Sequence, residues 1–117
     1  MRAALLIAPH TFVVQDHPHP EPRADEVLVR VTHAGVCGSD VHFYETGRIG
    51  EVVLTRPFIM GHEFSGVIEI PADSSPLAAG TRVAVDPAVP CGRCSFCREG
   101  RFNSCPDIRF TGVPPYP

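Results

Sequence analysis

The sequence lacks the patterns that define several common classes of protein. No apolar repeat of 3.6 residues persists for three turns, which excludes a helical bundle. The apolar run within residues 1–8 is too short to span a membrane and is followed by Pro9, so it predicts a first strand and not a signal peptide. A net charge of −3 offers no attraction to phosphates or anionic lipids, so we expect neither nucleic acid nor a membrane as a partner.

Glycine spacing of the nucleotide-binding type is also missing. No two of the ten glycines stand two positions apart, so the motif G-x-G-x-x-G does not occur. The 117 residues suffice for one domain, 1–117, and leave no room for an additional βαβ nucleotide-binding unit. Residues 114–117 are typical of the middle of a loop, so we expect the chain to be a fragment of a longer protein.

Proline and glycine are abundant, with thirteen and ten residues, and they divide the sequence into short pieces. Strands are predicted at 26–32, 64–70 and 81–86. In the first of these, Val27, Val29 and Val31 should form the buried face, with Arg30 and Thr32 on the other face. The pattern therefore predicts a mainly β fold, an antiparallel barrel of short strands.

Only one helix is predicted, a short one at 38–45, with Ser39 or Asp40 capping its start. The proline-rich segments 18–22 and 71–76 are predicted to be turns or loops between strands.

Four of the five cysteines lie within fifteen residues in the pattern C-x2-C-x2-C-x7-C, namely Cys91, Cys94, Cys97 and Cys105. Four thiolates at such short spacings can surround one zinc ion in a tetrahedron and leave no position for substrate. We therefore predict a structural zinc lobe at about 90–106, ordered only with its metal. Free or oxidised thiols are the alternative, and a tetrahedral sulfur site also accepts iron. These spacings and the odd cysteine count favour reduced thiolates in a cytoplasmic protein over disulfides.

A second group of candidate metal ligands comprises Cys37, His62 and Glu63. A thiolate, an imidazole and a carboxylate can hold a catalytic zinc while a fourth position stays open for water or substrate. The residues alone leave an alternative open, because a lone cysteine after a strand is commonly a core residue and Gly61-His62-Glu63 is commonly a loop. Adjacent residues of a strand point to opposite faces, so either Gly61 relaxes the backbone or a water replaces Glu63 as ligand.

Two polar residues near Cys37 have predicted roles in this site. Asp40 is a candidate to orient the ring of His62 without touching the metal, and Ser39 could pass a proton towards His42. A simple helix cap is the alternative role for both Asp40 and Ser39.

Three segments together point to one family. Gly35-Val36-Cys37-Gly38-Ser39-Asp40-Val41-His42, Gly61-His62-Glu63-Phe64-Ser65-Gly66-Val67 and the four-cysteine lobe closely resemble the amino-terminal, GroES-like catalytic domain of zinc-dependent medium-chain alcohol dehydrogenases. Segments 42–50 and 110–115 are most similar to the sorbitol and xylitol dehydrogenase branch. The resemblance covers essentially the whole chain and implies a GroES-like, partly open antiparallel barrel with short helices.

The resemblance also implies a site and an activity. Cys37, His62 and Glu63 would hold a catalytic zinc, which with the lobe makes two zinc ions per chain. Ser39 would belong to a proton relay, and Phe43 and Phe110 would line the substrate pocket, although such aromatic residues are commonly core. The implied reaction is zinc-assisted hydride transfer from a polyol to NAD or NADP, giving a ketose. A domain absent from this chain would bind that cofactor, so we expect the chain alone to be inactive.

Other readings of the sequence remain open. The substrate could be another secondary alcohol, of the threonine or butanediol type, and the chain could be a stand-alone or truncated zinc-binding module without enzyme activity. The GroES-like resemblance concerns the fold and carries little weight for a co-chaperonin role. Dimers or tetramers are usual in such families, so a homo-oligomer is expected for the full-length enzyme.

Overall fold

The computed structural model describes residues 1–116, which form short strands and short helices. In chain order the elements are β1 (Arg2–Ala8), β2 (Thr11–Asp16), β3 (Leu28–Ala34), α1 (Gly38–Thr46), β4 (Arg48–Ile49), β5 (Val52–Val53), β6 (Phe64–Ile70), β7 (Arg82–Val85), β8 (Ala88–Val89), α2 (Ser95–Arg98), the 3-10 helix η1 (Phe102–Ser104) and β9 (Arg109–Phe110). None of the helices in this described part has the length and apolar character needed to cross a bilayer.

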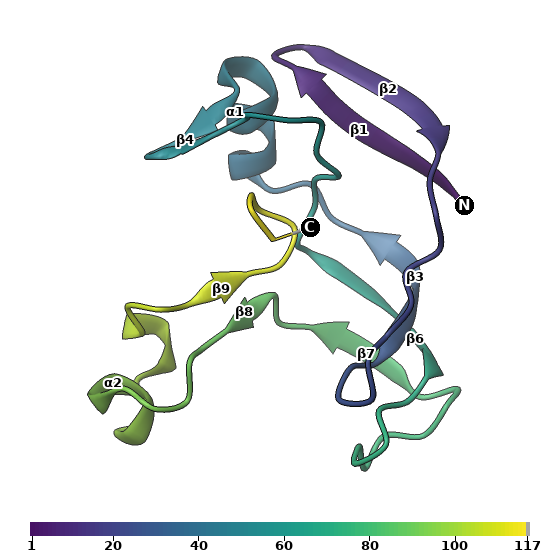
Figure 1. Cartoon of the computed structure of the whole chain (residues 1–117), viewed down its shortest axis with the longest axis vertical. Helices are drawn as coiled ribbons and strands as arrows, with labels where there is room; N and C mark the ends of the chain where they lie inside the picture. The colour runs from purple at the N-terminus through teal and green to yellow at the C-terminus, as the bar shows by residue number, and fades with distance from the viewer. Residues whose placement is uncertain (117) are drawn as a thin grey trace.

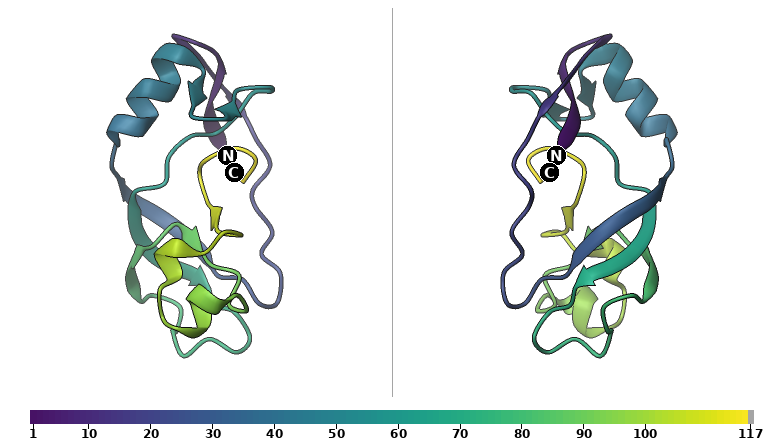
Figure 2. Two further views of the ribbon diagram at one scale, coloured as in Figure 1. Left: turned by 90° about the vertical axis from the view of Figure 1, so that its left-hand side faces the viewer. Right: turned by 90° about the vertical axis from the view of Figure 1, so that its right-hand side faces the viewer.

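All strand pairs are antiparallel, and they form several small sheets in place of one closed barrel. The largest sheet has the order β3-β6-β7, and the pairs β1-β2, β4-β5 and β8-β9 are separate two-stranded ribbons. Figure 1 shows β1, β2 and α1 at one end of the molecule and α2 at the other, and both views of Figure 2 agree. The prediction of a mainly β, partly open antiparallel fold is confirmed.

The elements with a clear local pattern occur, although β3 begins and ends two residues later than the predicted 26–32. Strand β6 has the predicted bounds, β7 lies within the predicted 81–86, and α1 extends the predicted helix by one residue to Thr46. Strand β2, the two-residue strands and the helices of the cysteine lobe were missed. Two residues are too few to show a period, and such pairs form only because another segment lies beside them.

The buried apolar side chains come chiefly from β1, α1, β6 and the cysteine lobe. Its largest fully buried side chains are Leu6, Phe43 and Ile68, and burial of each such side chain contributes about 1.5–3 kcal/mol. The backbone of Leu6 exchanges two hydrogen bonds with Phe58, of 2.9 and 3.0 Å, and the Phe58 side chain is also buried. This contact attaches the hairpin to the segment that leads into His62 and Glu63.

The predicted burial of one face of β3 is wrong. Val27 precedes the strand and is 41% exposed, Val31 is 51% exposed, and only Val29 is half-buried. Alternation identifies which side chains share a face, but burial requires a second layer on that face. Among residues 1–116, the buried core residues lie elsewhere, and no second layer covers Val31.

Candidate metal centre

Cys37 lies between the end of β3 and the start of α1. It occupies the N-cap position of α1 with extended backbone angles (φ −78°, ψ 155°). Ser39 or Asp40 was predicted to cap the start of this helix, and the N-cap position itself belongs to Cys37. Asp40 still caps the helix from inside its first turn, because its Oδ2 accepts a hydrogen bond of 2.9 Å from the backbone N–H of Cys37. This bond holds the backbone that carries the Cys37 thiol.

His62 and Glu63 come immediately before β6, so the alternation of side chains within a strand does not separate them. Gly61 has a φ of +117°, in the region that favours glycine, and it turns the chain just before the pair. The N–H of Gly35 donates a 2.7 Å hydrogen bond to the carbonyl oxygen of Glu63, which extends the β3-β6 pairing up to the site. One ligand atom from each of Cys37, His62 and Glu63 lies within 4.8 Å of the others.

The imidazole of His62 is buried and has an incomplete set of partners. Its Nδ1 makes no hydrogen bond with any of residues 1–116, although Asp40 Oδ1 lies 3.4 Å away. His62 is 7% exposed, and a buried polar nitrogen without a partner is costly. Histidines that bind a metal through one ring nitrogen almost always offer the other to a carboxylate, a carbonyl oxygen or water. The Asp40 carboxylate therefore lies between the two segments that carry the candidate ligands. One oxygen contacts the backbone N–H of Cys37, and the other lies beside the ring of His62.

The end of β9 and the residues after it close the site on one side. Phe110 meets His62 edge to face, with ring centroids 5.3 Å apart and an interplanar angle of 65°. Gly112 lies so close to Gly61 that a Cβ on Gly112 would be 1.8 Å from the Gly61 carbonyl oxygen, and its φ is +81°. Only glycine permits this approach, which brings the aromatic ring of Phe110 onto His62.

The remaining predicted residues lie along α1. Ser39 is half-buried and His42 is exposed, and their spacing of three residues places them on neighbouring positions of the helix surface. Phe43 is 1% exposed, so its side chain packs in the core and does not border open space in this structure. Of the two predicted pocket residues, only Phe110 lies against the candidate metal ligands.

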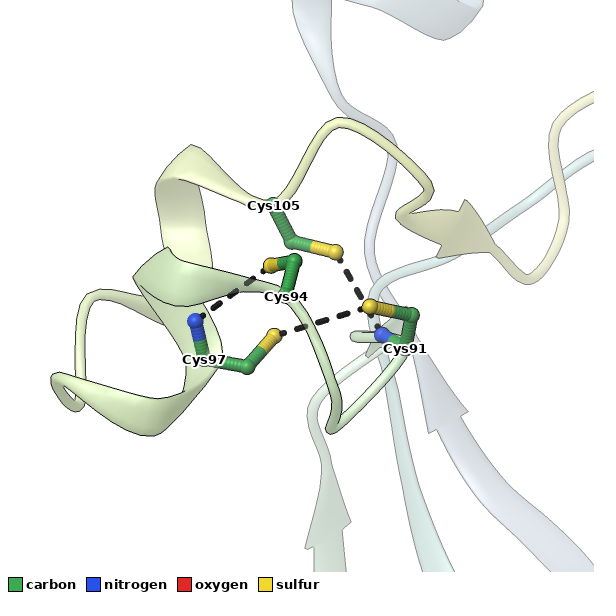
Figure 3. A group of neighbouring side chains, drawn as sticks. All are labelled: Cys91, Cys94, Cys97 and Cys105. Atoms are coloured by element: carbon green, nitrogen blue, oxygen red, sulfur yellow. Dashed lines mark hydrogen bonds between the residues drawn. The ribbon is translucent and has the colours of Figure 1, made fainter.

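The four cysteines of the lobe converge on a common point, as Figure 3 shows. Cys94 is the N-cap of α2, where its Sγ accepts a 3.4 Å hydrogen bond from the N–H of Cys97, and the N–H of Cys91 donates to Cys105 Sγ at 3.3 Å. Strands β8 and β9 pair at the base of this loop. All four sulfur atoms lie within 4.8 Å of one another.

Both groups fit zinc by the chemistry and spacing of their donors. Bonds of about 2.3 Å from zinc to thiolate in a tetrahedron place the sulfur atoms about 3.8 Å apart. The Sγ atoms of Cys91 and Cys97 lie 4.0 Å apart. The lobe thus offers four sulfur donors with every position filled, whereas Cys37, His62 and Glu63 offer three mixed donors and leave a fourth position for another ligand.

Two thiols of the lobe have strongly shifted pKa values. Hydrogen bonds from the backbone N–H groups of Arg93 and Cys94 lower the pKa of Cys91 to about 6. Burial raises the pKa of Cys97 to about 12, with a further contribution from the neighbouring Cys94 thiol. At neutral pH the metal-free lobe therefore has Cys91 as a thiolate and Cys97 as a thiol. Metal binding must displace the proton of Cys97.

Comparison with known proteins places the fold and this arrangement in a family. Residues 23–113 match the family described as "Alcohol dehydrogenase GroES-like domain". The chain is 46% identical over 116 residues to the sorbitol dehydrogenase of Bacillus subtilis (strain 168), covering 98% of this chain and 33% of that protein. It is 44% identical over 109 residues to D-xylulose reductase A of Aspergillus oryzae, covering 92% of this chain and 30% of the relative.

Solved structures show the same relationship in three dimensions. L-idonate 5-dehydrogenase from Escherichia coli superimposes with a TM-score of 0.86 at 35% identity, over 98% of this chain and 33% of the other. A short chain alcohol dehydrogenase from Escherichia coli CFT073, solved with its cofactor NADH, gives a TM-score of 0.81 at 39% identity. This match covers 97% of this chain and 32% of the other. The chain belongs to the alcohol dehydrogenase GroES-like domain family and spans about a third of the length of these relatives.

Sequence reasoning missed two glycines that shape the site. Gly112 permits the approach to Gly61, and Gly35 lies against Glu63, where a Cβ would be 2.7 Å from Oε2. The only signal in the sequence is their nearness to Phe110 and Cys37, which does not show what each would contact.

Proposed function

We propose that this chain is the catalytic, zinc-binding part of a zinc- and NAD(P)-dependent oxidoreductase that oxidises a polyol of the sorbitol or xylitol type to a ketose. The observation that carries the proposal is the convergence of Cys37, His62 and Glu63, whose ligand atoms lie within 4.8 Å of one another. The names of the relatives, sorbitol dehydrogenase and D-xylulose reductase, support the substrate class. A relative solved with NADH supports a nicotinamide cofactor, which sequence beyond this chain would bind.

In this proposal Cys37, His62 and Glu63 hold the catalytic zinc, and the four-cysteine lobe holds a structural zinc. A bound zinc acts as a Lewis acid that lowers the pKa of a coordinated hydroxyl group towards neutrality. Asp40 keeps the ring of His62 oriented and fixes the backbone of Cys37 through the contacts described above. Phe110 covers one edge of His62 and keeps water from that side.

The proton of the substrate hydroxyl needs a path to solvent, and α1 provides one. Ser39 follows Cys37 by two residues and is half-buried, whereas His42 is one helical turn further on and exposed. Ser39 Oγ would accept the proton and pass it towards the imidazole of His42 at the surface. The direction of the path, from buried to exposed, is what supports this assignment.

The proposal is tested first by counting zinc in the purified chain with native mass spectrometry. We expect two zinc ions in the wild type, one in Cys37→Ser and one in Cys94→Ser, because the two sites share no ligand. If the wild type binds a single zinc, which Cys37→Ser retains and Cys94→Ser loses, the four-cysteine lobe would be the one zinc site of the chain. The chain would then be a zinc-binding module without a catalytic site.

Substrate class is tested on the same chain with cobalt(II) in place of zinc. Thiolate-bound cobalt absorbs visible light, and its spectrum reports any change of ligand at the open position. Addition of sorbitol should shift the part of the spectrum that Cys37→Ser abolishes, and threonine should not. A response to threonine alone would transfer the proposal to a different class of secondary alcohol.

A further inference from the structure

A small pocket with one cationic residue is lined by segments that are close in sequence to the candidate metal centre. Its volume is about 220 Å³, and two separate segments form its walls. The apolar lining consists of Val52, Val53, Phe58, Pro114 and Pro115, and the two polar residues are Thr55 and Arg56. Pockets that hold a whole ligand usually measure about 300–1,000 Å³. This one is therefore suited to one end of a ligand.

The charge in the pocket is uncompensated. Arg56 has neither a hydrogen bond nor an ion pair with any of residues 1–116. Arg2, Arg30 and Arg82 also lack such partners, and what distinguishes Arg56 is that it is the arginine that lines this pocket. No aspartate or glutamate lines the pocket in this part of the chain. Arg56 is exposed, and its guanidinium is permanently charged and presents five N–H donors to an anion.

The pocket is within reach of the candidate metal ligands along both of its walls. Phe58 precedes His62 by four residues, a chain segment that spans at most about 14 Å. On the other wall, Pro114 follows Gly112 by two residues, and Gly112 lies against the Gly61 carbonyl group. The first wall therefore limits the separation of Phe58 and His62 to about 14 Å, which is on the scale of one extended substrate molecule with a charged end.

We propose that Arg56, with Thr55, binds the anionic end of the substrate, so that the preferred substrate is a polyol with a carboxylate or phosphate group at one end. This inference rests on the proposed function, because it gives the polyol of that reaction a charged terminus. Carboxylates and phosphates share the paired oxygens that a guanidinium binds through two parallel hydrogen bonds. Thr55 contributes a hydroxyl group that can donate to the same oxygens.

The test uses three probes that share a six-carbon chain and differ in their ends: sorbitol, D-gluconate and sorbitol 6-phosphate. Each is titrated into the 15N-labelled, zinc-loaded chain while the amide NMR signals of residues 52–56 are followed. We expect saturable shifts of these signals with an anionic probe, at a Kd at least tenfold below that of sorbitol. Arg56→Gln should weaken this binding tenfold or more.

The matched control is Arg82→Gln, which removes an equally exposed arginine from β7, outside the pocket. It should leave the Kd unchanged, and an equal loss in Arg82→Gln would reduce the effect to net charge and overturn the inference. Equal binding of sorbitol and both anions would overturn it as well. Preference for D-gluconate identifies a carboxylate, and preference for sorbitol 6-phosphate identifies a phosphate.

The same titration separates this inference from the proposed function. Arg56 does not depend on the catalytic zinc, so the anion should still shift residues 52–56 in Cys37→Ser. If the wild type binds a single zinc but retains this shift, the proposed function fails and the anion site stands. If two zinc ions bind and no anion shifts these signals, the catalytic site stands and the anion site fails.

Discussion

Asp40 Oδ1 lies 3.4 Å from His62 Nδ1, while Oδ2 of the same carboxylate accepts the N–H of Cys37. Asp40→Asn keeps an oxygen for Cys37 but loses the negative charge beside the imidazole. Partners of this kind are worth about 10–100-fold in metal affinity, so we expect the second zinc to bind that much more weakly. Competition with a chromophoric chelator measures this affinity, and the zinc of the lobe should be unaffected.

Glu26→Gln is the matched control, because Glu26 Oε2 also accepts a backbone N–H, from Arg23 at 3.1 Å, but Glu26 belongs to neither group of candidate metal ligands. Equal zinc affinities in Asp40→Asn and the wild type would show that Asp40 acts only as a helix cap.

Gly112→Ala should lower the free energy of unfolding by more than the backbone strain alone. The new Cβ would overlap the Gly61 carbonyl oxygen, so the 110–113 segment has to move and Phe110 leaves His62. We expect a loss of at least about 3 kcal/mol, measured by denaturant unfolding of the zinc-loaded chain. Gly80→Ala isolates the strain term, because its φ is +86° and nothing lies within 4 Å of its Cβ; it should cost about 1 kcal/mol. Similar losses in the two variants would contradict a close Gly61–Gly112 contact.

Removal of the structural metal should expose the cysteine lobe to proteolysis. Arg93, Arg98 and Arg101 are exposed trypsin sites within the lobe, and without zinc the short α2 has little else to hold it. We expect Cys94→Ser, or chelator treatment of the wild type, to accelerate cleavage at these sites at least tenfold. Cleavage at Arg30 in β3 should keep its rate. Identical cleavage patterns with and without metal would show that the lobe is held by protein contacts alone.

Proton release on zinc binding should depend on pH through Cys91. Its folded pKa of about 6 lies below the usual thiol value of 9.0, so its ionisation stabilises the metal-free lobe fully above pH 9, and this contribution is lost as the pH falls from 9 to 6. Below pH 6 Cys91 is protonated. Zinc must then displace a proton from Cys91 as well as from Cys97. Calorimetry in buffers of different ionisation enthalpy, on Cys37→Ser to isolate the lobe, should detect about 0.7 more protons released at pH 5.5 than at pH 7.5. The same number of released protons at pH 5.5 and pH 7.5 would contradict a Cys91 pKa of about 6.

Features that depend on neighbouring residues in the chain could be predicted from the sequence. The bounds of β6 and α1 follow from local alternation and from glycine and polar residues at the helix ends. The exposure of Val31 could not be predicted, because burial depends on what covers a strand and not on its own pattern. The missing hydrogen-bond partner of His62 Nδ1 and the pocket at Arg56 are likewise visible only in the folded chain.

The two metal centres differ in the same way. Four cysteines within fifteen residues can surround one ion with little help from the rest of the molecule, so their spacing alone predicts a common site. Cys37 and His62 are distant in the chain, and the β3-β6 register, with Ala34 opposite Phe64, brings their segments together. Pairing register and the contact of Gly112 with Gly61 are relations through space, set by packing and hydrogen bonds between remote segments. The types of candidate ligand could be identified from the sequence, but only the tertiary structure brings Cys37 close to His62 and Glu63.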